Sequence, residues 1–179
     1  MELLNAIAKR RSIQTYASTP VPREALLGLV DAARKAPSAA NQNAWRFVLV
    51  TDRETLDRLS QTHRFCGWLA SAQAAIAVVI DPAATRYWLE DSCVAASFIW
   101  LAATDAGLGA AWGAMHQSGD PVESQRRQDC VREVLGIPAG LNVPVVLGIG
   151  FPGGEPRPRI VPELAQLVSW ERYAAALGG

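Results

Sequence analysis

Eleven consecutive residues, Cys93 to Ala103, carry no charge and form the most apolar run in the sequence. A bilayer-spanning helix needs about 20 apolar residues, so this run is too short to cross a membrane. The surrounding pattern predicts a helix from about Thr85 to Asp105 that is apolar on every side through the run. Such a helix has no face suited to water, and we expect packed protein to cover it all round.

The rest of the chain alternates irregularly between helical and extended patterns. Helices are predicted over residues 2–9, 23–36, 53–60 and 121–135, strands over 45–50, 74–80, 110–115 and 143–149, and a short helix near Trp170 at the end of an extended tail. This mixture predicts an α+β fold with helices packed on one central sheet. At 179 residues and 19.2 kDa, a single domain spanning residues 1–179 is expected. No G-x-G-x-x-G segment links a strand to a helix, which argues against a Rossmann fold.

Charge and cysteine content limit the classes of partner. Seventeen basic and seventeen acidic residues cancel, so no general attraction to nucleic acid or to a membrane surface is expected. Any bound anion must be held by a local basic cluster. The first residues lack the order of charged and apolar segments that a secretory signal has. Cys66, Cys93 and Cys130 are widely spaced, which favours reduced thiols and a cytoplasmic protein.

The sequence lacks the common motifs of protein-based catalysis. The two histidines, His63 and His116, have no partner at metal-ligand spacing, so no metal site is predicted. No G-x-S-x-G, Walker lysine or Cys–His signature is present. If the protein is an enzyme, a bound cofactor is expected to supply the chemistry.

Three segments favour such a cofactor. Arg10-Arg11-Ser12 and Arg157-Pro158-Arg159 combine guanidinium groups with a hydroxyl donor or rigid proline flanks, as a phosphate site requires, although either pair alone is more typical of a solvated surface. Between residues 36 and 47 an amide-rich loop leads from a helix into a buried strand. Amide side chains both donate and accept hydrogen bonds, which suits a heterocycle with carbonyls and ring nitrogens. An ordinary capping loop would explain only part of this run.

These segments, taken in order, resemble the nitroreductase family of flavoproteins. The resemblance covers nearly the whole chain and rests on these motifs: Arg10-Arg11-Ser12-Ile13, Pro20-Val21-Pro22, Ala36-Pro37-Ser38 with Asn41, Trp45-Arg46-Phe47, Glu90-Asp91-Ser92, Gly107-Leu108-Gly109, Trp112, Leu135-Gly136-Ile137-Pro138, Gly148-Ile149-Gly150-Phe151-Pro152 and Pro156-Arg157-Pro158-Arg159. None is highly specific by itself, but several in the right order are difficult to obtain by chance.

The resemblance implies a nitroreductase-like fold, with a central mixed, mainly antiparallel sheet flanked by helices, in an intertwined homodimer. It implies two FMN sites at the subunit interface, with NADH or NADPH as electron donor and nitro compounds, quinones or related small molecules as acceptors in a ping-pong reaction. The long apolar helix would then form the dimer core. No catalytic side chain is named, because flavin N5 carries the chemistry.

The resemblance assigns the cofactor contacts to Arg10, Arg11, Ser12, Gln14, Pro37, Ser38, Asn41, Asn43, Trp112, Gly113, Arg157 and Arg159. Arg10 and Ser12 would lie on the phosphate and ribityl side, and Arg157 and Arg159 would close on the phosphate. The loop with Ser38, Asn41 and Asn43 would reach the flavin of the other subunit. Trp112-Gly113 would pass over the flavin. Candidates for the acceptor pocket are Phe65, Trp68 and Trp88, for which core packing is an equally good explanation.

Two departures from the family pattern concern the flavin. Gln14 stands where the family usually has Arg or Lys near the pyrimidine edge, and Asn43-Ala44 stands where Gln-Pro is typical. A lost charge–charge interaction there would be worth on the order of 1–4 kcal/mol at intermediate dielectric. Neither change removes the phosphate-binding residues, so FMN is expected to bind with a lower potential or a different acceptor.

Two alternatives remain open. Reductive dehalogenases, flavin-destroying enzymes and azoline oxidases share the scaffold, although the region from Arg53 to Trp68 is short and weakly charged compared with the lid of the deiodinase-like members. A non-catalytic flavin-binding protein is the other alternative, supported by the same two departures. A flavin spectrum that neither NADH nor NADPH changed would favour one of these two alternatives.

Overall fold

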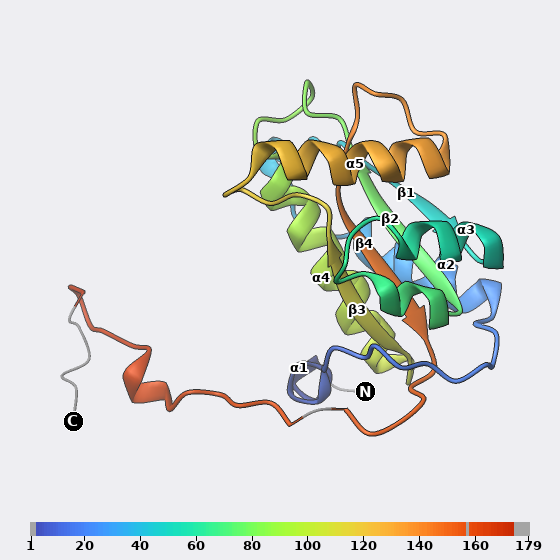
Figure 1. The fold of residues 1–179 in the computed structure, drawn as a ribbon. Coiled ribbons are helices and arrows are strands. Elements are labelled where there is room, and N and C mark those ends of the chain that lie inside the picture. The colour runs from blue at the N-terminus through green and yellow to red at the C-terminus, as the bar shows by residue number, and fades with distance from the viewer. Residues whose placement is uncertain (1–2, 157, 174–179) are drawn as a thin grey trace.

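A computed structural model describes residues 3–156 and 158–173 and shows one antiparallel sheet flanked by helices (Figure 1). The helices are α1 (Leu3–Lys9), α2 (Arg23–Ala33), α3 (Arg53–Ser60), α4 (Trp88–Asp105) and α5 (Pro121–Leu135), with short 3-10 turns at η1 (Ala39–Asn41), η2 (Gly67–Ser71) and η3 (Leu164–Gln166). The strands are β1 (Trp45–Val50), β2 (Ala74–Ile80), β3 (Gly109–Ala114) and β4 (Asn142–Gly150). The α+β class is confirmed.

The sheet has the order β1-β2-β4-β3, with every neighbouring pair antiparallel. The two central strands are built from aliphatic residues, and β2 is buried at all seven positions because it has a strand on each side and helices over both faces. A parallel bridge between Ser12 and Ala110 adds the segment after α1 to the outer edge of β3. The prediction of a mixed, mainly antiparallel sheet is therefore confirmed.

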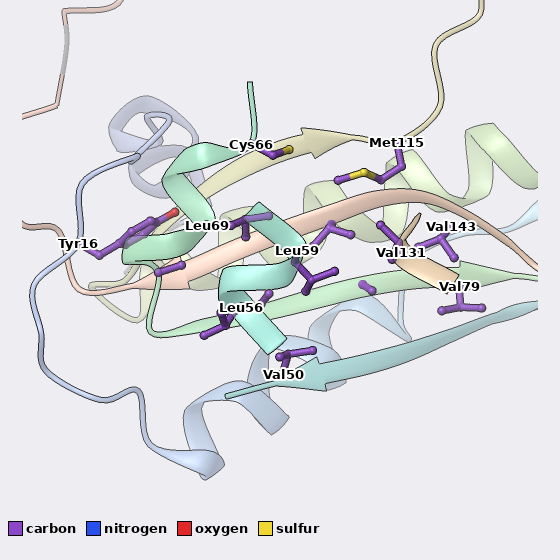
Figure 2. Packing of buried hydrophobic residues seen from close by; sticks show 14 of the residues in the cluster. Tyr16, Val50, Leu56, Leu59, Cys66, Leu69, Val79, Met115, Val131 and Val143 are labelled. Carbon is purple, nitrogen blue, oxygen red and sulfur yellow. The ribbon is translucent and has the colours of Figure 1, made fainter. Parts of the chain in front are cut away.

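Each face of the sheet carries its own hydrophobic core. On one face α2 and α4 pack through Leu26, Leu29, Ile99 and Ala103. On the other face α3, η2 and α5 cover the strands with residues that include Leu56, Leu59, Leu69 and Val131 (Figure 2). Tyr16 belongs to this second core, and its hydroxyl donates to the Gly148 carbonyl at 3.0 Å. The segment after α1 is thus packed into the core and is not a free loop.

The strands lie within one residue of their predicted bounds, and the differences fall at helix ends. The helix expected over 23–36 ends at Ala33, three residues before its predicted end. Helical spacing over residues 23–36 predicts Leu27 on the buried face, but Leu27 is half-exposed and Leu29 points into the core instead. The turn in the tail is at η3, upstream of Trp170, so the predicted position was wrong.

Complete coverage of α4, which its composition predicts, is not reached within one chain. Ala95, Ala96, Ile99 and Ala103 are fully buried, yet Ser97 on the opposite side is exposed. Val94, Phe98 and Leu101 beside it are only partly buried. Within the described part of the chain, no helix has both the length and the apolar content that crossing a membrane requires.

Two other apolar segments project from the fold. In α1, Leu4 is 76% exposed, and in the tail Ile160 and Trp170 are 94% and 81% exposed. Figure 1 shows the tail, in red, running past α1 and away from the rest of the molecule. Monomeric proteins rarely leave contiguous apolar surface of this kind uncovered.

Candidate functional site

A basic cavity of about 480 Å³ lies between the segment after α1 and the start of the tail. Its lining consists of Arg10, Arg11, Ser12, Ile13, Gln14, Thr15, Gly154, Glu155, Pro156, Pro158 and Arg159. Five of the predicted cofactor residues are therefore brought together: Arg10, Arg11, Ser12, Gln14 and Arg159. Arg157, also predicted for this site, lies outside the described residues.

A short antiparallel ladder joins the two walls of this cavity. Ala17 N–H donates to the Phe151 carbonyl and Gly153 N–H donates to the Thr15 carbonyl, each at 2.9 Å. Gly153 is required there, because a Cβ would lie 2.8 Å from the carbonyl carbon of Tyr16. The ladder holds residues near both ends of the chain in one fixed arrangement.

The inner wall is held against β3 in the same way. Ile13 N–H donates to the Ala110 carbonyl at 3.0 Å, directly beside Gly109. A Cβ at Gly109 would lie only 2.6 Å from Cβ of Ile13, so this close approach needs glycine. Gly109 therefore allows the segment after α1 to lie close enough to β3 to form this wall of the cavity.

The electrostatics of the cavity favour an anion. Burial, together with the neighbouring positive charges of Arg159 and Arg11, lowers the pKa of Arg10. A group of like charges is destabilising until a negative ligand neutralises it, and guanidinium groups with a hydroxyl are well matched to phosphate oxygens. The donor set present, with Ser12 beside the arginines, fits the phosphate of FMN.

Arg11 is positioned differently from its neighbours. Its Nη1 donates to the carbonyls of Ala8 and Arg10 at 2.7 and 2.9 Å. These bonds satisfy carbonyls at the end of α1, where a cation is favoured. Arg11 thus caps the C-terminal end of α1 and also contributes positive charge to the cavity.

The amide-rich loop forms a compact hydrogen-bonded unit. Ser38 Oγ accepts from Asn43 N–H at 3.0 Å, and Asn43 Nδ2 donates to the Asn41 carbonyl at 2.9 Å. Ala40, Asn41 and Asn43 have φ angles of 49°, 55° and 49°, a left-handed conformation that asparagine tolerates better than alanine does. Backbone strain of this kind is often concentrated at binding sites.

Asp91, at the start of α4, anchors this loop. Its buried carboxylate accepts from Ala39 N–H at 3.0 Å and from the Thr85 hydroxyl at 3.3 Å. Beside it, Pro37, Ser38 and Tyr87 contribute to a shallow hollow of about 340 Å³. The loop does not line the basic cavity of its own chain.

The predicted residues of β3 lie near that cavity without lining it. Trp112 is half-buried and stacks at a tilt against Trp100 of α4, with ring centroids 5.9 Å apart. Gly113 has no room for a side chain, since a Cβ would lie 2.9 Å from the Val146 carbonyl oxygen. Their predicted contact with the flavin stays a prediction.

The three candidates for an acceptor pocket occupy different surroundings. Phe65 is exposed, with the Arg64 guanidinium 4.5 Å from its ring centroid. Trp68 packs against the second core over Gly148, and Trp88 makes an edge contact with His116. No contact described for these residues joins any two of the three rings. Their role as an acceptor pocket therefore stays a prediction.

Sequence reasoning named neither Asp91 nor Trp100 as site residues. An acidic residue in the first turn of a helix is common, and only the structure shows that this one is buried. Trp100 was included in the apolar run of α4. A large aromatic residue in a helix otherwise rich in alanine was the available signal.

Comparisons with known proteins agree with this geometry. Residues 7–75 match the model of the nitroreductase family. A protein of Archaeoglobus fulgidus named "Putative NADH dehydrogenase/NAD(P)H nitroreductase" is 35% identical over 158 residues, which cover 86% of this chain and 87% of the relative. A solved structure from Bacteroides thetaiotaomicron with the same name is 31% identical, with a TM-score of 0.87 over 96% of this chain and 98% of the other. The structure of an FMN-dependent nitroreductase from Clostridium difficile is 30% identical, with a TM-score of 0.85 over 95% and 99%. The chain belongs to the nitroreductase family.

Proposed function

We propose that the protein uses NADH or NADPH to reduce nitroaromatic, quinone or related small acceptors in two alternating half-reactions at one FMN. Its class, an FMN-dependent NAD(P)H oxidoreductase, follows from its relatives. The observation that supports the cofactor most directly is the basic cavity in which Arg10, Ser12 and Arg159 meet. What we propose beyond this class is which acceptors the enzyme reduces and in which order the steps occur.

The side chains of this protein would bind and orient the cofactor, and FMN, when bound, would supply the redox chemistry between the nicotinamide and the acceptor. Arg10 and Arg159 would hold the phosphate as charge-assisted hydrogen-bond donors, and Ser12 would add a hydroxyl. Gln14 lines the same wall, and the resemblance implies that it would lie near the ring of bound FMN. No protein acid or base is required, because stacking, orientation and exclusion of water dominate hydride transfer.

The functional unit is a homodimer. The half-covered side of α4, the exposed apolar side chains of α1 and those of the projecting tail are apolar surfaces that a second copy of the chain would bury. In that dimer, Ser38, Asn41 and Asn43 would complete the cofactor site of the other subunit. Their separation from the basic cavity within one chain supports this arrangement. The cytoplasmic location stays a prediction.

A deiodinase-like activity is less well supported. The region that would serve as a lid contains α3, whose Leu56 and Leu59 are buried in the core, and η2, whose Leu69 is also buried. Because these buried leucines hold α3 and η2 against the core, the region has little freedom to close over a zwitterionic substrate.

The decisive experiment is an anaerobic visible spectrum of the purified protein, recorded before and after addition of NADH and then NADPH. Flavin bands that bleach with a nicotinamide and return with a nitroaromatic or quinone would support the proposal. A flavin spectrum that neither donor changes would favour a binding protein or a specialised oxidase. A protein that takes up no FMN would refute the proposal. Light scattering tests the dimer, and a monomer with bound flavin would refute the shared site.

A further inference from the structure

Trp100 of α4 contacts three residues in two segments next to the cofactor site, the segment after α1 and strand β3. The Arg10 guanidinium carbon lies 4.6 Å from the centroid of its ring. Its indole N–H donates to the Arg11 carbonyl at 3.2 Å. Its other neighbour is Trp112 of β3, at 5.9 Å between ring centroids.

The positive charge of Arg10 needs a stabilising partner. Among the described residues it forms no ion pair with a carboxylate, and the nearby charges of Arg159 and Arg11 oppose its own. A cation over an indole face is stabilised electrostatically, and tryptophan provides the strongest such face of any side chain. An aromatic partner leaves the guanidinium hydrogen-bond donors free for a ligand, whereas a carboxylate would compete with that ligand for them.

We infer that Trp100 is a positioning residue that holds Arg10 ready for the phosphate of FMN. The ring fixes the guanidinium, the indole N–H fixes the backbone at Arg11, and the contact with Trp112 ties both to β3. The inference rests on the proposed FMN function and concerns only the phosphate end of that cofactor. Trp100 therefore contributes to the preference for FMN over riboflavin, which differs from FMN only in lacking the phosphate.

The experiment is a flavin titration followed by quenching of flavin fluorescence, with FMN and with riboflavin, at one ionic strength. In Trp100→Leu the FMN dissociation constant should rise about fivefold, the size of a partly desolvated cation–π contact, while that of riboflavin stays unchanged. Trp100→Phe should give a smaller rise than Trp100→Leu because it keeps an aromatic face over Arg10, but it should still bind FMN less tightly than wild type because a benzene ring attracts a cation less strongly and lacks the N–H. Phe47→Leu, which removes an aromatic ring of β1 that packs on the same core as Trp100 and lies in neither cavity, should leave the ratio of the two constants unchanged.

A double-mutant cycle identifies the route of the effect. In an Arg10→Met background, Trp100→Leu should no longer alter the FMN-to-riboflavin ratio, because the group that Trp100 positions is absent. An equal loss for both flavins, or a ratio effect that persists without Arg10, would overturn the inference. If Trp100→Leu does not fold, the same cycle with Trp100→Phe decides the question.

The outcome also separates the inference from the proposed function. Wild-type protein that binds neither flavin would refute both. Wild-type protein that prefers FMN, with the same preference in Trp100→Leu, would refute the role of Trp100 and leave the proposed function intact.

Discussion

Asp91→Ala tests whether one buried carboxylate holds the amide-rich loop. The change removes the acceptor of two hydrogen bonds, from Ala39 N–H at 3.0 Å and from the Thr85 hydroxyl at 3.3 Å. A hydrogen bond to a charged group contributes about 1.5–3 kcal/mol. Water can reach the half-buried Ala39, but Thr85 is only 6% exposed, and its hydroxyl would lose the acceptor of its proton while still accepting from Tyr87 N–H at 3.1 Å. The expected loss is therefore about 2–3 kcal/mol.

For a chain of this length, 1 kcal/mol lowers the melting temperature by roughly 2–4 °C, so Asp91→Ala should melt about 5–10 °C lower. The assay is thermal denaturation followed by circular dichroism at fixed protein concentration. Asp91→Asn should lose less, because its amide oxygen still accepts from Ala39 and the Thr85 hydroxyl can rotate to accept from the amide nitrogen. Glu90→Ala, a change at the exposed neighbour, is the control. An Asp91→Ala protein as stable as Glu90→Ala would refute the reasoning.

Three further predictions concern single side chains. Gln14→Arg, which adds a positive charge to the cavity wall, should raise the FMN midpoint potential in a dye-coupled titration, since positive charge stabilises the reduced flavin; an unchanged or lower potential would contradict this. Arg126 and Arg127 lower the pKa of Glu123 from 4.5 to about 2, so its stabilising contribution is present above pH 4.5 and is lost as the pH falls toward 2. Glu123→Gln should thus be less stable than wild type in urea at pH 7 and equally stable near pH 2, and a difference that persists at low pH would argue against the ion pairs. Burial raises the pKa of Cys66 to about 12, so iodoacetamide at pH 8 should leave it unmodified in the native protein and alkylate it after denaturation, as read by peptide mass spectrometry. Equal labelling in both states would show that the thiol is accessible.

Periodic patterns predicted the sheet well because they report local burial. The seven apolar residues of β2 and the aliphatic run of β4 have few alternatives to central strands. The phase of α2 was harder to predict, since Leu26, Leu27 and Leu29 are equally apolar and only the position of the sheet decides which of them is buried.

The candidate site was predictable where one segment carries its chemistry. The arginines after α1 and the amides of the loop were identified from neighbouring residues in the sequence. Contacts across the fold left no comparable local signal. Nothing next to Trp68 indicates that its ring packs over Gly148, and nothing next to Trp100 indicates that Arg10 lies above it.

The ladder between residues 15–17 and 151–153 has a consequence for biosynthesis. Its hydrogen bonds join segments more than 130 residues apart, so one wall of the basic cavity is synthesised long before the other. The strands of the sheet precede the second wall in the sequence and can assemble first, but the phosphate site cannot form until the chain has passed Arg159. Cofactor capture is thereby restricted to polypeptides that contain both walls, and a nascent chain that has not reached Arg159 would withdraw no FMN from the cell.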